Sequence, residues 1–351
     1  MDIAETTLDA SGSRPAAALP RADLARAAEV GADVAATLRW VVDVAPRLPH
    51  PGGGRTGELW SALASVAAAD VAVARMLEPH LDALAVLDQA PEPPDLAVVG
   101  AGPGSTWGVY AAEGPGVRLD AVTDGGAWRL TGTKPWCSLA ADLSHALVTA
   151  WTDDGRRLFA VDLRTPAVRA ADGPWVPRGL PQVVSAPVTF DGAPAVPVGA
   201  AGWYLERPGF AWGGIGVAAC WWGGAVGLAR TLWAALGRRE PDQLALAHLG
   251  AVDVALTGAR AVLAEAASAV DAGVSGRESS VLARRARTVV ADAVEEVQRR
   301  CAHALGPGPL TADEAFARRV ADLGLYVRQH HAERDQASLG RDLLAAGTCP
   351  W

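Results

Sequence analysis

Residues 130–148 read LTGTKPWCSLAADLSHALV, and the stretch lies inside a region of short alternating or apolar runs that extends from about residue 105 to 190. DGG at 124–126 and DDG at 153–155 separate these runs with the residues that hairpin turns require. Lys134, in the middle of the quoted stretch, is the single lysine of the chain. The pattern predicts a compact antiparallel β block.

Helical periodicity flanks this β block on both sides. Apolar residues recur three and four positions apart from residue 21 to about 90, and again over long stretches between 244 and 344. The order of helices, strands and helices predicts an α+β fold. Its expected parts are a flexible N-terminal tail at 1–20, an N-terminal helical domain at 21–104, a central antiparallel β domain at 105–200 and a C-terminal helical domain at 201–351.

Composition limits the classes of function. The chain has 351 residues, 50% of them hydrophobic, and a net charge of −8, so nucleic acid and anionic membranes are unfavourable partners. The four cysteines are far apart, without a CxxC pair or a histidine at zinc spacing, which predicts neither a metal site nor a disulfide framework. The N-terminus lacks an apolar signal-peptide core, so we expect a cytoplasmic protein.

One uncharged segment, residues 210–229, is long enough to span a bilayer. It carries six glycines, helical pattern continues beyond it, and no basic loop marks an orientation. A helix buried on all sides within a large bundle gives the same signal. The buried helix is the favoured interpretation, and a membrane protein is the least favoured class.

Residues 95–105, DLAVVGAGPGS, have the glycine spacing of a dinucleotide-binding turn. That turn needs a helix directly after its glycines, because the helix N-terminus holds the pyrophosphate. Here WGVY follows, and then Gly-Pro-Gly at 114–116, which is incompatible with one amphipathic helix. A glycine-rich linker into the β block is the better interpretation.

The element order and several local motifs resemble the acyl-CoA dehydrogenase superfamily of flavoproteins over about residues 57–340. GTKPWCS at 132–138 is similar to the family segment that lies against the flavin. The resemblance implies that Trp136 flanks the flavin ring and that Cys137 and Ser138 donate hydrogen bonds that tune its potential. It also implies a C-terminal four-helix bundle and assembly into a homodimer or homotetramer.

Further contacts to FAD are implied by less complete matches. Glu113 matches the glutamate of a family turn, but the residues on either side of it, Ala112 and Gly114, differ from that turn. Gln243 and, approximately, Arg239 match a helix that reaches the FAD of a neighbouring subunit. Gly306 and Gly308 match a glycine turn that approaches the same FAD, although a simple turn between helices explains these glycines about as well.

The catalytic glutamate of the family is missing. Gln329, His330 and His331 occupy the place where the family has Glu-Gly-Thr. On a continuous helix His331 would point about 100° away from His330, so we expect His331 to be structural. Three other glutamates remain candidates for the catalytic base: Glu333, Glu206 and Glu265.

The histidines resemble another branch of the superfamily, the flavin-dependent monooxygenases. Asp70 and His80, ten residues apart, together with Ser138 and a late histidine, are similar to that branch. The resemblance implies that His80, Ser138 and His330 surround the reacting part of the flavin and control its protons. A lone histidine on a helix is, however, more often a surface or core residue.

The sequence therefore predicts an acyl-CoA dehydrogenase-like oxidoreductase that moves hydride between a small acyl substrate and FAD, with an electron acceptor as partner. A CoA thioester is one form of that substrate. One alternative is a two-component monooxygenase, which uses O2 and diffusing reduced FMN or FAD from a flavin reductase. Another is a non-catalytic protein that keeps the fold for binding.

Overall fold

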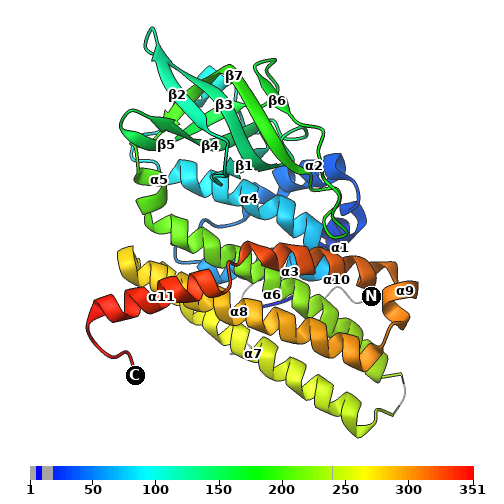
Figure 1. The fold of residues 1–351 in the computed structure, drawn as a ribbon. Coiled ribbons are helices and arrows are strands. Elements are labelled where there is room, and N and C mark those ends of the chain that lie inside the picture. The colour runs from blue at the N-terminus through cyan, green and yellow to red at the C-terminus, as the bar shows by residue number, and fades with distance from the viewer. Residues whose placement is uncertain (1–4, 10–18, 239) are drawn as a thin grey trace.

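The computed structural model describes residues 5–9, 19–238 and 240–351, and its first part is helical (Figure 1). Asp70 separates the third and fourth helices and caps the fourth, because its side chain accepts a hydrogen bond from the backbone N–H of Val73. The elements before the sheet are α1 (Arg21–Val30), α2 (Val34–Val44), η1 (Ala45–Arg47), α3 (Thr56–Ala69), α4 (Val71–Asp88) and η2 (Leu96–Val99). No helix follows the glycines at 100–104 in this described region, which agrees with the linker interpretation.

The strands form one sheet that closes on itself, since β4 pairs with both β2 and β5. They are β1 (Trp107–Tyr110), β2 (Leu119–Asp124), β3 (Ala127–Ser138), β4 (His145–Thr152), β5 (Gly155–Asp162), β6 (Val168–Ala170) and β7 (Ser185–Val198). Most pairs are antiparallel, but β1 and β4 are parallel, so the prediction of a wholly antiparallel block is corrected. The chain reverses once at the β2–β3 turn and again between β3 and β4, so β4 runs in the direction of β1 and β2.

Helices of different lengths follow the sheet and lie below it in Figure 1. They are α5 (Trp203–Glu206), α6 (Pro208–Leu236), α7 (Gln243–Asp271), α8 (Gly276–Leu305), α9 (Gly308–Ala312), α10 (Glu314–Tyr326), η3 (Val327–Gln329) and α11 (Glu333–Ala346). Helix α6 packs against α3, α7, α8 and α10, while α11 packs on α8. The chain is thus a mixed helix and strand fold in which α4 lies between the sheet and α6.

The uncharged segment at 210–229 lies within α6, inside the helical part, as the buried-helix interpretation predicts. Within the described residues, α6 and α7 are long and apolar enough to cross a membrane by length and composition alone. The most apolar window is 72% buried in α6 and 17% buried in α7. The sequence predicted both segments as helical, but only residues 210–229 were considered as a candidate membrane span.

Glycines let α6 approach α3 closely. A Cβ atom on Gly223 would collide with the backbone carbonyl of Ala64 and lie 2.6 Å from its Cα. A Cβ atom on Gly227 would lie 3.0 Å from the carbonyl oxygen of Ala68, one turn further along both helices. Two glycines of this segment, Gly223 and Gly227, are therefore required by helix packing.

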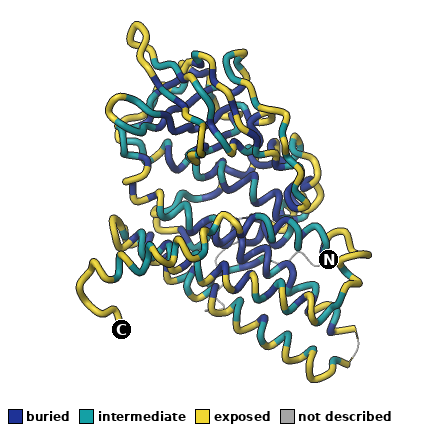
Figure 2. The backbone as a smooth tube through the Cα atoms, in the orientation of Figure 1, coloured by how far each residue is buried: buried dark blue, intermediate teal, exposed yellow. Residues whose placement is uncertain are grey.

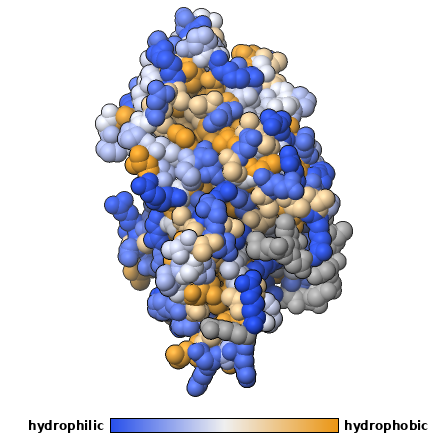
Figure 3. Space-filling view, turned by 90° about the vertical axis from the view of Figure 1, so that its right-hand side faces the viewer, coloured by the Kyte–Doolittle hydropathy of each residue, from blue (hydrophilic) through white to orange (hydrophobic). Residues whose placement is uncertain are grey.

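The buried core is continuous through the helices and the sheet (Figure 2). Leu63 of α3, Phe190 of β7 and Leu323 of α10 belong to one cluster of buried side chains. The division into domains at residues 104 and 200 stays a prediction. The face seen in Figure 3 mixes hydrophobic and hydrophilic residues over both parts, so hydropathy there does not single out a binding site.

The flexible tail at 1–20 stays a prediction, but residues 5–9 contact α3. The backbone N–H groups of Thr6 and Leu8 donate to the hydroxyls of Ser65 and Ser61 at 2.9 and 3.1 Å. Leu8 is buried. This segment is held because α3 offers hydroxyl acceptors for its backbone and an apolar surface for Leu8.

Candidate functional site

A cleft lies between the sheet, α4 and the end of α10. Its inner part has a volume of about 260 Å³ and its outer part about 670 Å³. Both parts share Arg75, Tyr110, Trp136, Ser138 and Gln329 in their walls, so they form one continuous space. The outer part alone falls within the range of about 300–1,000 Å³ that small-molecule sites usually have.

Trp136 stands at a bulge in β3, at the wall of both parts of the cleft. The register between β3 and β7 shifts between Lys134 and Cys137, so two residues of β3 oppose one of β7. Trp136 has a φ of 57°, a region that bulky residues rarely adopt, and it is 63% exposed. The side chain of Trp136 is therefore not part of the buried core. Its ring is available to stack on a planar ligand.

Ser138 lies at the floor of the cleft and is fixed by a hydrogen-bond network. Its Oγ accepts a hydrogen bond from Nη2 of Arg75 at 3.0 Å and lies 2.8 Å from Oγ of Ser185. The hydroxyl of Tyr110 donates to its backbone carbonyl at 2.9 Å. Trp136 and Ser138 thus meet in the cleft, as the sequence motif leads us to expect.

The thiol of Cys137 is buried and is not in the wall of the cleft, so the donor role expected of Cys137 stays a prediction for its backbone N–H alone. Cys137 is 1% exposed, and its Sγ lies 3.4 Å from the carbonyl oxygen of Lys134. Burial raises the pKa of the thiol to about 12. The physical reason is the alternation of a strand, in which neighbouring residues face opposite sides of the sheet.

Glu113 lines the outer part of the cleft and is bound to the single lysine of the chain. Nζ of Lys134 donates to Oε1 of Glu113 at 2.5 Å and to Oγ1 of Thr149 at 2.9 Å. Nε of Arg156 lies 3.2 Å from the same carboxylate oxygen. Lys134 is 1% exposed, and burial lowers its pKa. The ion pair anchors the cleft wall to the sheet, a role that the sequence analysis did not recognise.

His80 is buried beneath β1 and is not brought to the cleft. Its Nδ1 accepts a hydrogen bond from the backbone N–H of Trp107 at 3.2 Å. Burial lowers its pKa to about 4, so the ring is neutral. His80 ties α4 to β1, which corrects the expectation that it faces Ser138.

His330 also lies outside the cleft. Its Nε2 is 3.2 Å from Oγ1 of Thr288, and its ring meets Trp221 edge-on. Helix α10 ends at Tyr326, and the chain bends through η3 to Ala332, whose φ is 46°. Residues 329–331 are therefore not on a continuous helix, so the rotation of about 100° per residue does not give the directions of His330 and His331.

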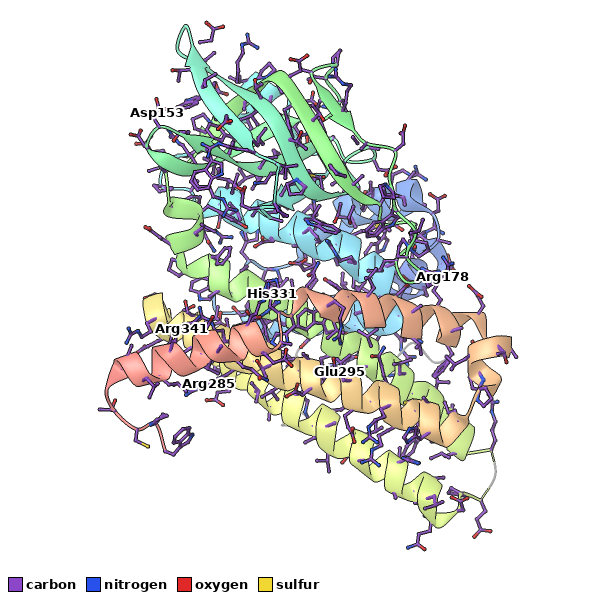
Figure 4. All side chains as sticks on the ribbon, in the orientation of Figure 1. Asp153, Arg178, Arg285, Glu295, His331 and Arg341 are labelled. Carbon is purple, nitrogen blue, oxygen red and sulfur yellow. The ribbon has the colours of Figure 1, made fainter. Side chains whose placement is uncertain are left out.

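Gln329 and His331 line the cleft instead of His330. Figure 4 shows His331 at the junction of α10 and α11. The amide of Gln329 occupies the place of the missing carboxylate. The three glutamates considered as substitutes, Glu206, Glu265 and Glu333, are all exposed and outside the walls of the cleft.

The residues expected to reach a neighbouring FAD lie together at the far end of the bundle. Gln243 begins α7, and Gly306 and Gly308 flank the turn after α8 (Figure 1). Rings near the start of α7 and the end of α8, those of His248 and His303, are 5.8 Å apart. Within one chain these positions are not brought to the cleft, and their contact with a second subunit stays a prediction. Arg239 lies outside the described residues.

Charged residues on α4 are the part of the cleft that the sequence analysis missed. Arg75, Glu78 and Asp82 are three and four positions apart and line its inner part. Asp82 lies 3.5 Å from Nη2 of Arg207, at the start of α6. The sequence did carry a signal for these residues, since three charges recur at helical spacing in an otherwise apolar helix. Charged residues are rarely buried unless they are paired or have a function.

Among the charged residues of α4 in the cleft, Glu78 has the carboxyl group with the most altered pKa. Burial, and then the neighbouring Asp82, raise its pKa to about 8, against the opposing effect of Arg75 and Arg287. No cluster of three or more His, Cys, Asp or Glu side chains suited to a metal occurs among the described residues. The cleft therefore combines an exposed aromatic ring, hydroxyl groups and an acid that changes its charge near neutral pH.

We expect the free energy of unfolding to report the protonation of Glu78. The folded pKa of about 8 lies above the ordinary value of 4.5, so the stabilising contribution is complete below pH 4.5 and is lost as the pH rises through 8. Between these limits Glu78 alone contributes a fall of about 1.4 kcal/mol per pH unit. Urea unfolding between pH 5 and 9 should show a shallower decline in Glu78→Gln than in the wild type. Parallel curves would contradict this.

Comparisons with known proteins identify the fold. No family model matches the chain, and no curated protein matches it. A solved structure of KijD3 in complex with FMN and dTDP-3-amino-2,3,6-trideoxy-4-keto-3-methyl-D-glucose is 23% identical, with a TM-score of 0.81 over 98% of this chain and 97% of that one. The dibenzothiophene monooxygenase TdsC from Paenibacillus sp. A11-2 is 19% identical, with a TM-score of 0.72 over 94% and 98%.

A nitrososynthase from Micromonospora carbonacea var. africana is 21% identical, with a TM-score of 0.73 over 92% of this chain and 94% of that one. The chain thus has the acyl-CoA dehydrogenase-like fold that its motifs resemble, and the proteins that share this fold include members of the monooxygenase branch.

Proposed function

We propose that the cleft binds a flavin and that the protein is a flavin-dependent monooxygenase, which receives reduced FMN or FAD from a reductase. The exposed ring of Trp136, held at the bulge beside Ser138, carries this proposal. The likeness to KijD3 in complex with FMN, to a dibenzothiophene monooxygenase and to a nitrososynthase supports it.

The residues of the outer cleft fit a flavin. Trp136 offers a face for the ring, and Ser138 and Ser185 offer hydroxyl groups for its polar edge. Nε1 of Trp175, also in the wall, is buried and has no hydrogen-bond partner among the described residues, so a ligand acceptor would satisfy it. When bound, reduced flavin supplies the electrons that activate O2.

The protein's own groups would favour and protect this chemistry. The guanidinium of Arg75 lies at Ser138 and favours negative charge on a bound ligand. Leu180, Val183 and Leu325 form an apolar part of the wall and exclude water. FAD would fit the same recognition groups as FMN.

Acyl-CoA dehydrogenation is the second candidate function. It is favoured by the carboxyl group of Glu78, which reaches the inner cleft and could accept the α-proton of an acyl substrate. The amide of Gln329 cannot accept that proton, and it stands where the family has its base. We therefore favour monooxygenation over acyl-CoA dehydrogenation.

Two assays separate the candidates. A monooxygenase consumes O2 in the presence of substrate and reduced flavin, delivered by a reductase with NADH. A dehydrogenase holds oxidised flavin that an acyl-CoA bleaches anaerobically, with electrons passing to an acceptor dye. A protein that binds no flavin would favour the non-catalytic alternative and contradict both.

Replacing Trp136 by alanine should weaken flavin binding about 10- to 100-fold. The change removes the stacking surface, and a loss of about 1.4–2.8 kcal/mol corresponds to that range. Trp351→Ala is the matched control, because Trp351 is 94% exposed at the C-terminus. Anaerobic titration with FMN and FAD in both redox states measures the affinity. Equal affinities of Trp136→Ala and wild type would contradict the stacking role.

Self-association is a further part of the proposal. Helix α7 exposes Leu244, Leu246 and Val254 at 72%, 52% and 73%, which supports burial against another copy in a homodimer or homotetramer. Light scattering of the purified protein tests the oligomeric state. The cytoplasmic location likewise stays a proposal, and it rests on composition.

A further inference from the structure

The inner part of the cleft ends on one face of α4. Arg75, Glu78, Pro79 and Asp82 of this helix form its wall, with Tyr204 of α5 nearby. Pro79 lies inside the helix and has no N–H to donate to the carbonyl of Arg75, one turn earlier. The helix presents the carboxyl groups of Glu78 and Asp82 as acceptors in the wall of this space.

Glu78 is the unusual member of this wall. It is 9% exposed, and its carboxyl group makes no hydrogen bond or ion pair with any residue that the structure describes. Asp82, one turn further on, has Arg207 at 3.5 Å. A buried carboxyl group without a partner is costly, and folded proteins rarely keep one unless a ligand or water completes its hydrogen bonds.

We propose that Glu78 binds the reacting group of the substrate and exchanges a proton with it. This inference rests on the proposed flavin-dependent oxygenation. It assigns the substrate to molecules whose reacting group carries an exchangeable proton, a protonated amine N–H or a phenol O–H. Such a group can donate to the carboxylate of Glu78, whereas a thioether or hydrocarbon cannot.

The proton transfer balances without a further reagent. The N–H or O–H bond of the substrate breaks, an O–H bond forms on the carboxylate of Glu78, and the bonding electron pair stays on the substrate atom. The nitrogen of the amine, or the ring carbon ortho or para to the phenolate oxygen, thereby becomes the nucleophile that oxygen transfer requires. No atom is oxidised in this step, and O2 with reduced flavin supplies the oxygen later.

The surroundings of Glu78 suit this exchange near neutral pH. Asp82, on its own helix, disfavours the carboxylate, and Arg75 and Arg287 favour it. Tyr204, Tyr326 and Cys220 face it from α5, α10 and α6, and the pKa of each of these groups is raised by burial, so they stay neutral. Because burial raises the pKa of Glu78 to about 8, both of its charge states are accessible between pH 7 and 9.

The test uses the full chain loaded with flavin and two probe panels, primary amines and phenols of matched size. Calorimetry in two buffers of different ionisation enthalpy counts the protons that move on binding. We expect at least one panel to bind wild type with proton exchange, and Glu78→Gln to bind at least tenfold more weakly and without it. Glu265→Gln, at an exposed position on α7, is the control and should match wild type.

Turnover of a bound probe gives the second readout. Glu78→Gln should lower kcat/KM by about 100-fold or more and remove the rise of activity through the pKa of Glu78, while Glu78→Asp keeps part of both. Flavin affinity should stay unchanged in all three variants. Loss of flavin binding by wild type would refute the proposed function. Wild type that binds flavin but neither panel, or Glu78→Gln with an unaltered pH profile, would refute the role of Glu78 alone.

Discussion

Gly223→Ala should destabilise the protein by about 3 kcal/mol or more, although alanine is the better helix former by about 1 kcal/mol. The added Cβ would lie 2.6 Å from Cα of Ala64 and collide with its carbonyl, so α3 and α6 would have to separate. The obstacle is backbone, which cannot change rotamer. The steric cost therefore outweighs the gain in helix propensity.

Gly250→Ala on α7 is the matched control. Nothing lies within 4 Å of the position that its Cβ would occupy. It should leave the free energy of unfolding unchanged or raise it by up to about 1 kcal/mol. Urea unfolding followed by circular dichroism measures both variants. If Gly223→Ala were as stable as Gly250→Ala, the close packing of α6 on α3 would be wrong.

Glu113→Ala should destabilise the protein by about 3 kcal/mol, the low end of the range for breaking a buried ion pair, because Glu113 itself is 34% exposed. The change leaves the ammonium of Lys134, which is 1% exposed, with Oγ1 of Thr149 as its remaining hydrogen-bond partner in the described structure. It should also weaken ligand binding, since Glu113 lines the outer cleft.

Lys134→Met should cost less, about 1 kcal/mol, because it removes the buried charge and leaves Glu113 with Arg156 at 3.2 Å. In the double variant Glu113→Ala with Lys134→Met, the destabilisation should be smaller than the sum of the single changes. Urea unfolding of the four proteins gives the coupling energy. Additive effects would show that the pair carries no coupling.

The fold could largely be predicted from sequence because its periodicities are strong. The helical stretches on both sides of the strands and the motif around Trp136 sufficed for the element order and the fold. The parallel pairing of β1 with β4 could not be predicted, because hairpin signals fix neighbouring strands and β1 pairs with a distant one. The buried ion pair of Lys134 could not be predicted either, because its partner Glu113 lies 21 residues away in the sequence.

The site was less predictable for a related reason. Sequence spacing placed Trp136 and Ser138 at the cleft, because both belong to one local motif. It failed for His330, because the break of α10 before residue 329 changes which side chains face the cleft. It missed Glu78, because the helical spacing of Arg75, Glu78 and Asp82 does not by itself tell whether these charges are buried or lie on a solvated face.

Anaerobic titration of the purified protein with reduced FMN, followed by tryptophan fluorescence, tests the central claim most directly. The account predicts saturable quenching in wild type, because flavin binds against Trp136, and quenching with at least tenfold weaker affinity in Trp136→Ala. Trp351→Ala should follow the wild-type curve. If neither FMN nor FAD binds in either redox state, or if Trp136→Ala binds as tightly as wild type, the cleft is not the flavin site described above.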